Sequence, residues 1–342
     1  MAAAKQVQSA TQPIERFRRE LDALVPPQAA IGIAVSGGPD SLALLILAAE
    51  ARPLQVEAAT VDHALRPESR AEAEMVAQLC ERLGVPHTIL TATWDRKPET
   101  AIQERARAMR YRLLGQWARE RGLTAVLTAH HLDDQAETFL MRLARGAGVR
   151  GLAGMRRVAR VPGGELAIVR PLLGWRHSGL EAVCAAAGVE PVQDPSNEDE
   201  QFERVRIRKA LAGADWLNGF AIAESAAHLA EADGALHWAT DLEWKRAVTR
   251  NGAQIVYKPT DAPRDIRRRI VRRAVLALAT EGGGAELRGR EIGQLLAALR
   301  TGRRATLRGV LCIGGPEWRF SRSPARRSNA APASADVGAV EG

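Results

Sequence analysis

The sequence predicts an α/β fold: a doubly wound parallel sheet, followed by a helical region and a small α+β domain. Two observations lead to this prediction. Between residues 30 and 173, short apolar runs typical of strands alternate with longer helical patterns, as they do in βαβ units. After residue 198 the alternation stops, and charged helical sequence precedes a segment with both helix and hairpin patterns.

The elements of the first part follow in order along the chain. A strand is expected where a short apolar run is bounded by turn residues, and a helix where apolar residues recur at helical spacing. The expected strands are 30–35, 55–61, 87–91, 123–128 and 166–170. The expected helices are 40–50, 69–84, 100–121, 133–145 and 178–187. Ligands of such sheets bind outside the C-terminal strand ends, so we expect the site there.

The later segments are expected to form smaller parts. Residues 199–250 are helical and charged, and most of their tryptophans, Trp216, Trp238 and Trp244, are expected to be core aromatics rather than base-stacking platforms. The third part is expected to contain helices 263–280 and 287–299 and a hairpin of strands 306–312 and 318–321.

These patterns divide the chain into five segments. The turn-rich run Asp194-Pro195-Ser196-Asn197 marks the end of the sheet domain. The expected segments are an N-terminal extension at 1–27, a catalytic sheet domain at 28–198, a helical linker at 199–253, a small basic domain at 254–325 and a disordered tail at 326–342.

The composition limits the kinds of function that the chain can have. A chain of 342 residues is long enough for two or three domains. Its apolar runs are shorter than the ~20 residues that cross a bilayer, and its start lacks the apolar core of a secretion signal, so we expect no membrane and a cytoplasmic location. Cys80, Cys184 and Cys312 stand singly in apolar runs and are expected to be buried, which disfavours a disulfide framework or a zinc site.

Positive charge is concentrated in the C-terminal third. The formal net charge is +8, and residues 264–327 contain sixteen arginines against five acidic residues. Arginine clusters can contact phosphates and give a salt-dependent grip on nucleic acid. A solvated helix face would show a similar run of charge, but the asymmetry between the parts of the chain favours a polyanionic partner.

Residues 36–41, Ser-Gly-Gly-Pro-Asp-Ser, lie between a strand-like and a helix-like run. Adjacent glycines let several backbone N–H groups point at one place, and the following helix start adds positive charge, so the loop suits a pyrophosphate. It lacks the lysine of the Walker loop. Taken alone, it would more often be an ordinary turn with Asp40 or Ser41 as helix cap.

A second polar segment, AHHLDDQAETFLMRLARGAGVRG at 129–151, also follows a short apolar run. Asp134 and Glu137 are three residues apart and share a helix face. Clustered carboxylates beside a nucleotide can bind a metal, recognise an ammonium group or accept its proton. Acids in a first helical turn also complement the helix dipole, which is about as probable a role for Asp133.

Together the two segments resemble the N-type ATP pyrophosphatase (PP-loop) superfamily and, within it, the tRNA(Ile)-lysidine synthetases. That family pairs S-G-G-x-D-S with H-x-x-D-D-Q-x-E-T and R-G-S-G. The resemblance is dense from about residue 30 to 210 and extends to three further runs, 61–66, 170–172 and 194–197. Ala147 stands where the family usually has Ser, and Val205 where it usually has Asn.

The resemblance implies an ATP-dependent carbon–nitrogen ligase. Such an enzyme adenylates the wobble cytidine (position 34) of tRNA(Ile) with a CAU anticodon, releases pyrophosphate, and then lets L-lysine displace AMP to form lysidine. Codon reading thereby changes from AUG to AUA, and amino-acid identity from methionine to isoleucine. The implied cofactors are ATP and Mg²⁺, and the implied partners are tRNA and lysine, with a homodimer left open.

The site residues are assigned partly by the resemblance and partly by the patterns above. The catalytic candidates are Asp40, Asp134, Glu137 and Arg145. The ATP-binding candidates are Ser36, Gly37, Gly38, Pro39, Asp40, Ser41, Asp62, His63 and His131, with Asp40 also the metal ligand. The tRNA-binding candidates are Arg206, Arg208, Arg268 and Arg272.

Two other functions are compatible with these patterns. One is another PP-loop tRNA-modifying enzyme, either a thiolase or an amidating ligase, although the isolated cysteines disfavour thiolation and no glutaminase domain is evident. The other is a non-catalytic tRNA-binding protein with a decayed ATP site, which the intact loop and acidic segment argue against.

Overall fold

The computed structural model describes residues 2–64, 68–94, 102–161, 164–192, 199–279, 287 and 289–323, without the side chains of residues 2–11 and 68. The chain divides into two compact units, Met1–Gly234 and Ala235–Gly342. The expected boundary run 194–197 and the expected tail 326–342 lie outside the described residues.

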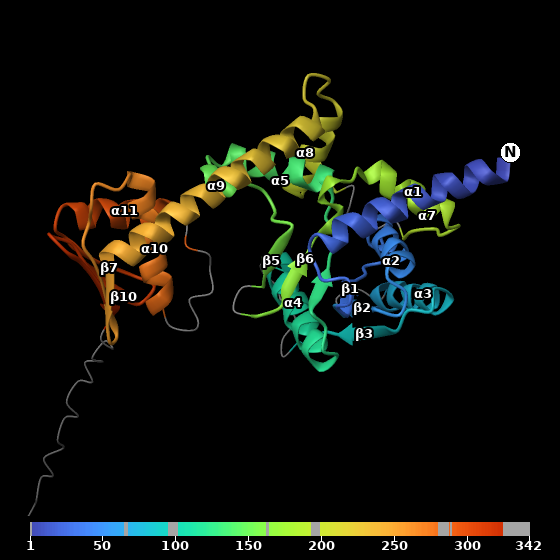
Figure 1. The fold of residues 1–342 in the computed structure, drawn as a ribbon, viewed down its shortest axis with the longest axis horizontal. Helices are drawn as coiled ribbons and strands as arrows, with labels where there is room; N and C mark the ends of the chain where they lie inside the picture. Colours follow the sequence, from blue (N-terminus) through green and yellow to red (C-terminus); the bar gives the residue numbers. More distant parts are fainter. Residues whose placement is uncertain are drawn as a thin grey trace, which may run out of the picture. The chain divides into compact units, whose positions relative to one another are not determined.

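A six-stranded sheet forms the centre of the first unit (Figure 1), in the order β3-β2-β1-β4-β6-β5. Its strands are β1 (Ile31–Ala34), β2 (Val56–Asp62), β3 (His87–Thr91), β4 (Ala125–Leu127), β5 (Val158–Arg160) and β6 (Ala167–Val169). Strands β3, β2, β1, β4 and β6 pair in parallel, and β5 joins β6 in antiparallel fashion. The order reverses beside β1, so ligands are expected where that strand ends.

The helices of this unit include counterparts of the five expected ones, at 39–51, 68–82, 102–120, 132–144 and 177–186, and others that were not individually expected. In chain order, the helices are α1 (Ala2–Asp22), α2 (Pro39–Ala51), α3 (Glu68–Arg82), α4 (Ile102–Glu120), α5 (Leu132–Ala144), α6 (Val149–Leu152), the 3-10 turn η1 (Pro171–Gly174), α7 (His177–Ala186), α8 (Glu203–Ala212) and α9 (Gly219–Ala247), whose last part belongs to the second unit.

Apolar side chains cover both faces of the sheet, alternating along each strand. Ala58 of β2 belongs to a core with residues of α1, α2, α3 and α7. The next residue, Ala59, joins Leu114 and Trp117 of α4 in a second core. This period of two is that of a strand buried on both sides. The predicted doubly wound parallel sheet is therefore confirmed.

The second unit has a five-stranded antiparallel sheet, in the order β7-β8-β11-β10-β9. Its strands are β7 (Val248–Asn251), β8 (Gln254–Tyr257), β9 (Arg304–Leu307), β10 (Val310–Ile313) and β11 (Trp318–Arg322). Helices α10 (Arg264–Leu278) and α11 (Gly289–Arg300) pack on it through a buried apolar cluster. The predicted α+β character of this part is confirmed.

Several local expectations were wrong. Residues 306–312 form the ends of two strands rather than one strand, because Arg308 and Gly309 have φ values of 51° and 72°, as a two-residue hairpin turn requires. Strand β7 lies inside the segment expected to be helical. The edge strand β5 was not expected, and the N-terminal extension contains a helix whose Phe17 and Leu21 are buried in the core.

Two expectations from composition can be compared with the structure. Cys80, Cys184 and Cys312 are buried and free, as predicted, and burial raises the pKa of each thiol. Among the described helices, none is both long and apolar enough to span a bilayer.

Candidate active site

The loop 36–41 connects β1 to α2 at the C-terminal edge of the sheet. Gly37 has a φ of 85°, in the left-handed region that favours glycine. The backbone N–H of Ser36 donates to Ser41 Oγ at 3.1 Å, and Ser41 Oγ donates to the Gly38 carbonyl at 2.9 Å. The first residues of α2 receive no side-chain cap from the described part of the chain. Pro39 has no N–H and the Ser41 N–H donates to the Gly38 carbonyl at 3.1 Å, so an anion here would be held by the N–H groups of Gly37, Gly38 and Asp40.

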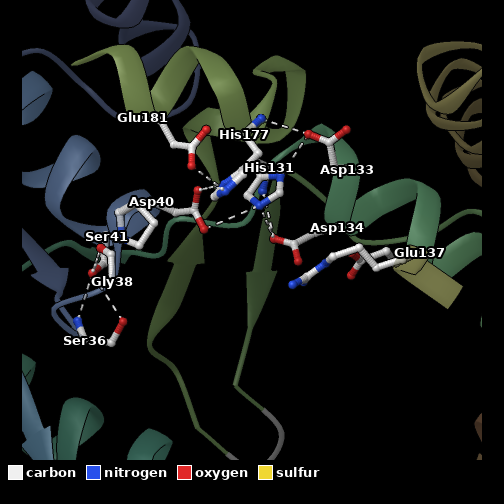
Figure 2. Close-up of polar contacts among 12 residues, drawn as sticks. Ser36, Gly38, Asp40, Ser41, His131, Asp133, Asp134, Glu137, His177 and Glu181 are labelled. Atoms are coloured by element: carbon white, nitrogen blue, oxygen red, sulfur yellow. Dashed lines mark hydrogen bonds and ion pairs between the residues drawn. The ribbon is translucent and has the colours of Figure 1, made fainter. Parts of the chain in front are cut away.

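Asp40 follows Pro39 at the start of α2, and its carboxylate faces two imidazoles (Figure 2). Asp40 Oδ1 lies 2.7 Å from His177 Nδ1, and Oδ2 lies 3.5 Å from His131 Nε2. The two imidazole ring centroids are 5.4 Å apart. Asp40 is thus held between residues that come from the starts of two other helices, α5 and α7.

The charges in this cluster reinforce one another. Burial by itself raises the pKa of Asp40, but hydrogen bonds and charges of His131 and His177 outweigh it and hold that pKa well below its usual range. Burial lowers the pKa of His131, but Asp133, Asp40 and Asp134 outweigh it and raise that pKa to about 10. The hydrogen bond to Asp40 raises the pKa of His177. At neutral pH, Asp40 is therefore an anion and His131 a cation.

The two acids at the start of α5 have different contacts. Asp133 Oδ2 accepts the His177 backbone N–H at 2.8 Å, and Oδ1 lies 3.5 Å from Arg176 Nη1. Asp134 Oδ2 accepts the His131 backbone N–H at 3.1 Å. Burial raises the pKa of Asp133, but bonds from His131 and the His177 backbone outweigh it and lower that pKa. Asp134 thus caps its own helix, while Asp133 joins α5 to α7.

Glu137 is buried deeper, at 2% exposure, and contacts two arginines of α8. Arg208 Nε donates to its Oε1 at 2.7 Å, and Arg204 Nε lies 3.0 Å from its Oε2. Arg204 also lies 3.8 Å from Asp134. The hydrogen bond to Glu137 raises the pKa of Arg208. Since an unpaired buried carboxylate is strongly unfavourable, this triad fixes α8 against α5.

Asp62 and His63 lie at the end of β2, beside the end of β1. Asp62 is buried, and its Oδ1 accepts the Ala64 backbone N–H at 2.8 Å. The His63 carbonyl accepts the Trp94 indole N–H at 2.8 Å. Burial and the charge of Arg110 lower the pKa of His63, so its ring is neutral at pH 7. Both residues share the sheet edge with the loop, as expected for parallel neighbours.

Arg145 is not brought into this cluster. It caps the C-terminal end of α5 and forms an ion pair with Glu203. Eleven residues of helix separate it from Asp134, a rise of roughly 16 Å. Its assignment as a catalytic residue stays a prediction, and within the described residues no contact joins it to the other candidates.

The four predicted tRNA-binding arginines already have partners within the protein. Arg208 contacts Glu137, and Arg206 donates to the Glu200 carbonyl at 2.7 Å. Arg268 lies 2.6 Å from an oxygen of Asp265, and Arg272 donates to the Leu287 carbonyl at 2.8 Å. Their role in RNA binding remains a prediction.

Sequence reasoning missed two members of the cluster, His177 and Arg204. His177 follows the apolar run after Arg170-Pro171-Leu172 and has no motif of its own. Its position as the first residue of α7, after a strand of the same sheet, is the signal that could have identified it, because successive strand ends share one edge. Arg204 lies in the arginine-rich run 204–208 beside the residues that were selected.

The cluster offers one carboxylate and two imidazoles as donors, where the motif implies Mg²⁺. Asp40, His131 and His177 place one donor atom each within 4.8 Å of one another. Mg²⁺ prefers oxygen and is usually held by one or two carboxylates together with substrate phosphates. The Asp40 carboxylate fits that pattern, whereas the imidazoles are better suited to pairing with anions or to binding transition metals.

Comparison with known proteins supplies the deciding observation. A family model described as a PP-loop domain matches residues 9–214. A tRNA(Ile)-lysidine synthase of Novosphingobium aromaticivorans is 49% identical over 319 residues, covering 93% of this chain and 96% of that protein. The chain belongs to the tRNA(Ile)-lysidine synthase family of PP-loop proteins. Proteins of the same name from Zymomonas mobilis and Methylobacterium nodulans are 42% and 44% identical, over 88% and 93% of this chain and 91% and 99% of theirs.

A solved structure supports the fold of the PP-loop unit. A U34-tRNA thiolase, NcsA from Methanococcus maripaludis with its 4Fe–4S cluster, aligns with a TM-score of 0.54 and 16% identity. The alignment covers 64% of this chain and 80% of that one. At this identity the likeness concerns the fold alone.

The structure shows where the two departures from the family pattern, Ala147 and Val205, lie. Val205 is buried, at 6% exposure, on the same helix as the two arginines that hold Glu137. Ala147 lies close to Gly151, where a Cβ built on the glycine would be 2.7 Å from the alanine Cβ. The close approach therefore explains why position 151 lacks a Cβ, and it gives no structural reason for alanine in place of serine at position 147.

Proposed function

We propose that this protein ligates L-lysine to the wobble cytidine of tRNA(Ile) with a CAU anticodon, using ATP and forming lysidine. The main support is that the phosphate loop and the Asp40–His131–His177 cluster lie together, in a chain whose relatives bear the name tRNA(Ile)-lysidine synthase. The modified tRNA would read AUA in place of AUG and carry isoleucine in place of methionine.

The phosphate loop supports the first step, adenylation. The cytidine O2 attacks the ATP α-phosphorus, an adenylate forms on the base, and pyrophosphate leaves with its electron pair. Backbone N–H groups of Gly37 and Gly38, together with the hydroxyls of Ser36 and Ser41, suit the charge that develops on the leaving pyrophosphate. His131, a cation in the resting site, adds positive charge beside them.

We assign Mg²⁺ to Asp40. When bound, the ion would neutralise phosphate charge and fix the phosphates for in-line attack. The protein's part is to keep the Asp40 carboxylate ionised and oriented, and the contacts from His131 and His177 support that role.

The acids of α5 support the second step, in which the lysine amine attacks the activated base carbon and AMP leaves. The amine must lose protons in this step, and a nearby carboxylate can hold the ammonium form and accept one. We favour Asp134 for this contact, because Glu137 is enclosed by two arginines. Glu137 is then a positioning residue.

The alternative PP-loop reading of thiolation gains no support from this structure, because Cys80, Cys184 and Cys312 all lie in apolar cores with raised thiol pKa values. A cytoplasmic location and a homodimer remain predictions from the sequence.

The test is incorporation of labelled lysine into tRNA(Ile) bearing CAU, with ATP and Mg²⁺, tracking AMP and pyrophosphate. We expect label on the tRNA in step with AMP release, and a loss of at least about 100-fold in Asp40→Ala. Glu181→Ala is the matched control, because Glu181 is another acid that contacts His177 but is largely exposed. Adenylated tRNA without label would change the nucleophile, and normal turnover in Asp40→Ala would refute the site.

A further inference from the structure

Two aromatic side chains, one just before α9 and one in its first turn, face solvent. Trp216 is 83% exposed and Phe220 is 53% exposed. The expectation that most tryptophans of this region belong to a core was therefore wrong for Trp216, and also for Trp238, which is 66% exposed. Burial is the ordinary state of large aromatic residues, so two exposed rings four residues apart require an explanation.

The two rings flank a segment that lies directly beside the catalytic cluster. A Cβ built on Gly219 would be 4.0 Å from Asp133 Oδ1 and 3.9 Å from Arg176 Nη1. The backbone between Trp216 and Phe220 thus approaches the starts of both α5 and α7.

The turn that carries the rings is well anchored. The Leu217 backbone N–H donates to the Ala214 carbonyl at 2.9 Å, and Asn218 Oδ1 accepts the Phe220 backbone N–H at 2.9 Å. Further along α9, Ile222 and Ala226 are buried. The exposed rings therefore project from a fixed backbone, which limits the entropy lost when something packs on them.

Partly exposed arginines that pair with acids of the cluster lie in the same part of the fold as the turn, and Arg176 approaches Gly219. Arg176, Arg204 and Arg208 have side chains 51%, 41% and 48% exposed, and all three belong to the ion-pair network of the cluster. Exposed aromatic rings next to arginines are the combination that binds single-stranded nucleic acid, because the rings stack on bases while the cations meet phosphates.

We propose that Trp216 and Phe220 form a stacking surface for an unpaired RNA base adjacent to the base that is modified. The proposal rests on the proposed function, since it takes the substrate to be a tRNA anticodon loop. To be modified, the target base must leave its neighbours and enter the site. An aromatic surface beside Asp133 would hold the base that loses its stacking partner.

The test is the affinity of the intact protein for a stem-loop RNA with the anticodon-loop sequence, measured without ATP by fluorescence anisotropy. We expect Trp216→Ala to weaken binding by roughly 5- to 150-fold, the range for loss of one base–aromatic stack. Phe220→Ala should weaken it as well, and Trp216→Phe should retain most of the affinity. Trp238→Ala is the matched control and should leave affinity unchanged, because Trp238 is likewise exposed but lies outside the turn that carries Trp216 and Phe220.

A second RNA separates stacking from a general effect on the surface. Removing the base, but not the sugar and phosphate, next to the target position should weaken wild-type binding and leave Trp216→Ala nearly unaffected. Equal affinity of wild type and Trp216→Ala for the complete stem-loop would overturn the proposal. It would also be overturned if Trp216→Ala weakened binding of a fully paired RNA as much as binding of the stem-loop. These binding measurements do not require lysine transfer, so a failure of the ligase assay would be distinguishable from a failure of the stacking surface.

Discussion

His130 and His131 are neighbours in the sequence with opposite charge states. Burial lowers the pKa of His130 to about 4, and nearby Arg170, Arg107 and Arg204 add to the effect while Asp134 opposes it. His131 instead lies 3.5 Å from each of three carboxylates, of Asp40, Asp133 and Asp134, and its pKa rises to about 10. Contacts alone decide which ring is a cation.

The low pKa of His130 makes stability depend on pH. Its pKa is 6.5 in the unfolded chain and about 4 in the folded one, so between these values the unfolded state binds more protons. The stability from a neutral His130 is therefore present above pH 6.5 and lost as the pH falls towards 4, by up to about 3 kcal/mol. Between pH 6.5 and 4.5, the free energy of unfolding measured with urea should fall less for His130→Gln than for wild type.

His237 provides the control for this measurement, because its side chain is 72% exposed. His237→Gln should follow the wild-type pH profile. A His130 ring that is protonated at pH 6 in an NMR titration would contradict the expectation.

At this scale the sequence was most informative about residues in motifs. The loop 36–41 and the acids of α5 were predicted and do lie at one sheet edge, because each follows a parallel strand. His177 and Arg204 were missed as site residues because their contacts span 137 and 67 positions of sequence, and no local pattern records such pairs. Which acid would contact lysine depends on whether arginines of α8 surround its carboxylate, and the sequence does not show how α8 packs on α5.

Among the elements, the connection between β10 and β11 packs closely against the end of α11. A Cβ built on Gly314 would collide with the backbone of Leu299 at the end of α11. We expect Gly314→Ala to destabilise the second unit by roughly 1–3 kcal/mol, since backbone cannot yield as a flexible side chain does. Thermal or urea unfolding of the full chain measures the change.

Gly293, in the middle of α11, is the matched control. Its built Cβ meets no atom of the described structure within 4 Å, and alanine is the better helix former by up to about 1 kcal/mol. Gly293→Ala should therefore stabilise the same unit. Equal effects of the two substitutions would show that the close approach at Gly314 does not constrain the fold.

Most elements could be predicted because their apolar period was regular over several turns. The failures occurred where one or two backbone angles decide the outcome. Arg308 gave no warning of a turn, since arginine rarely adopts a positive φ, so 306–312 was predicted as one strand. The edge strand β5 is short, and its residues Val158 and Arg160 are exposed, which leaves little apolar signal.

For the whole molecule, the excess of arginine in the C-terminal third predicts a salt-dependent grip on tRNA. Arg268 is partly exposed and paired with Asp265, so a phosphate would compete with that acid. We expect Arg268→Gln to weaken tRNA binding and to reduce the slope of log affinity against log salt by about one contact, or ~0.9.

Arg121→Gln is the comparison, because Arg121 is a surface arginine of the first unit that is paired with Glu57. Its salt slope should equal that of wild type. An unchanged slope for Arg268→Gln would remove this arginine from the docking surface.

Glu137 leaves the ribosome well before Arg204 and Arg208, because chains are made from the N-terminal end. A growing chain that has not yet reached α8 has the phosphate loop and the acids of α5 but lacks the cations that compensate Glu137 in its buried position. Its carboxylate must then remain in water or take up a proton. The contact between α5 and α8 that compensates Glu137 can therefore form only after α8 has been synthesised.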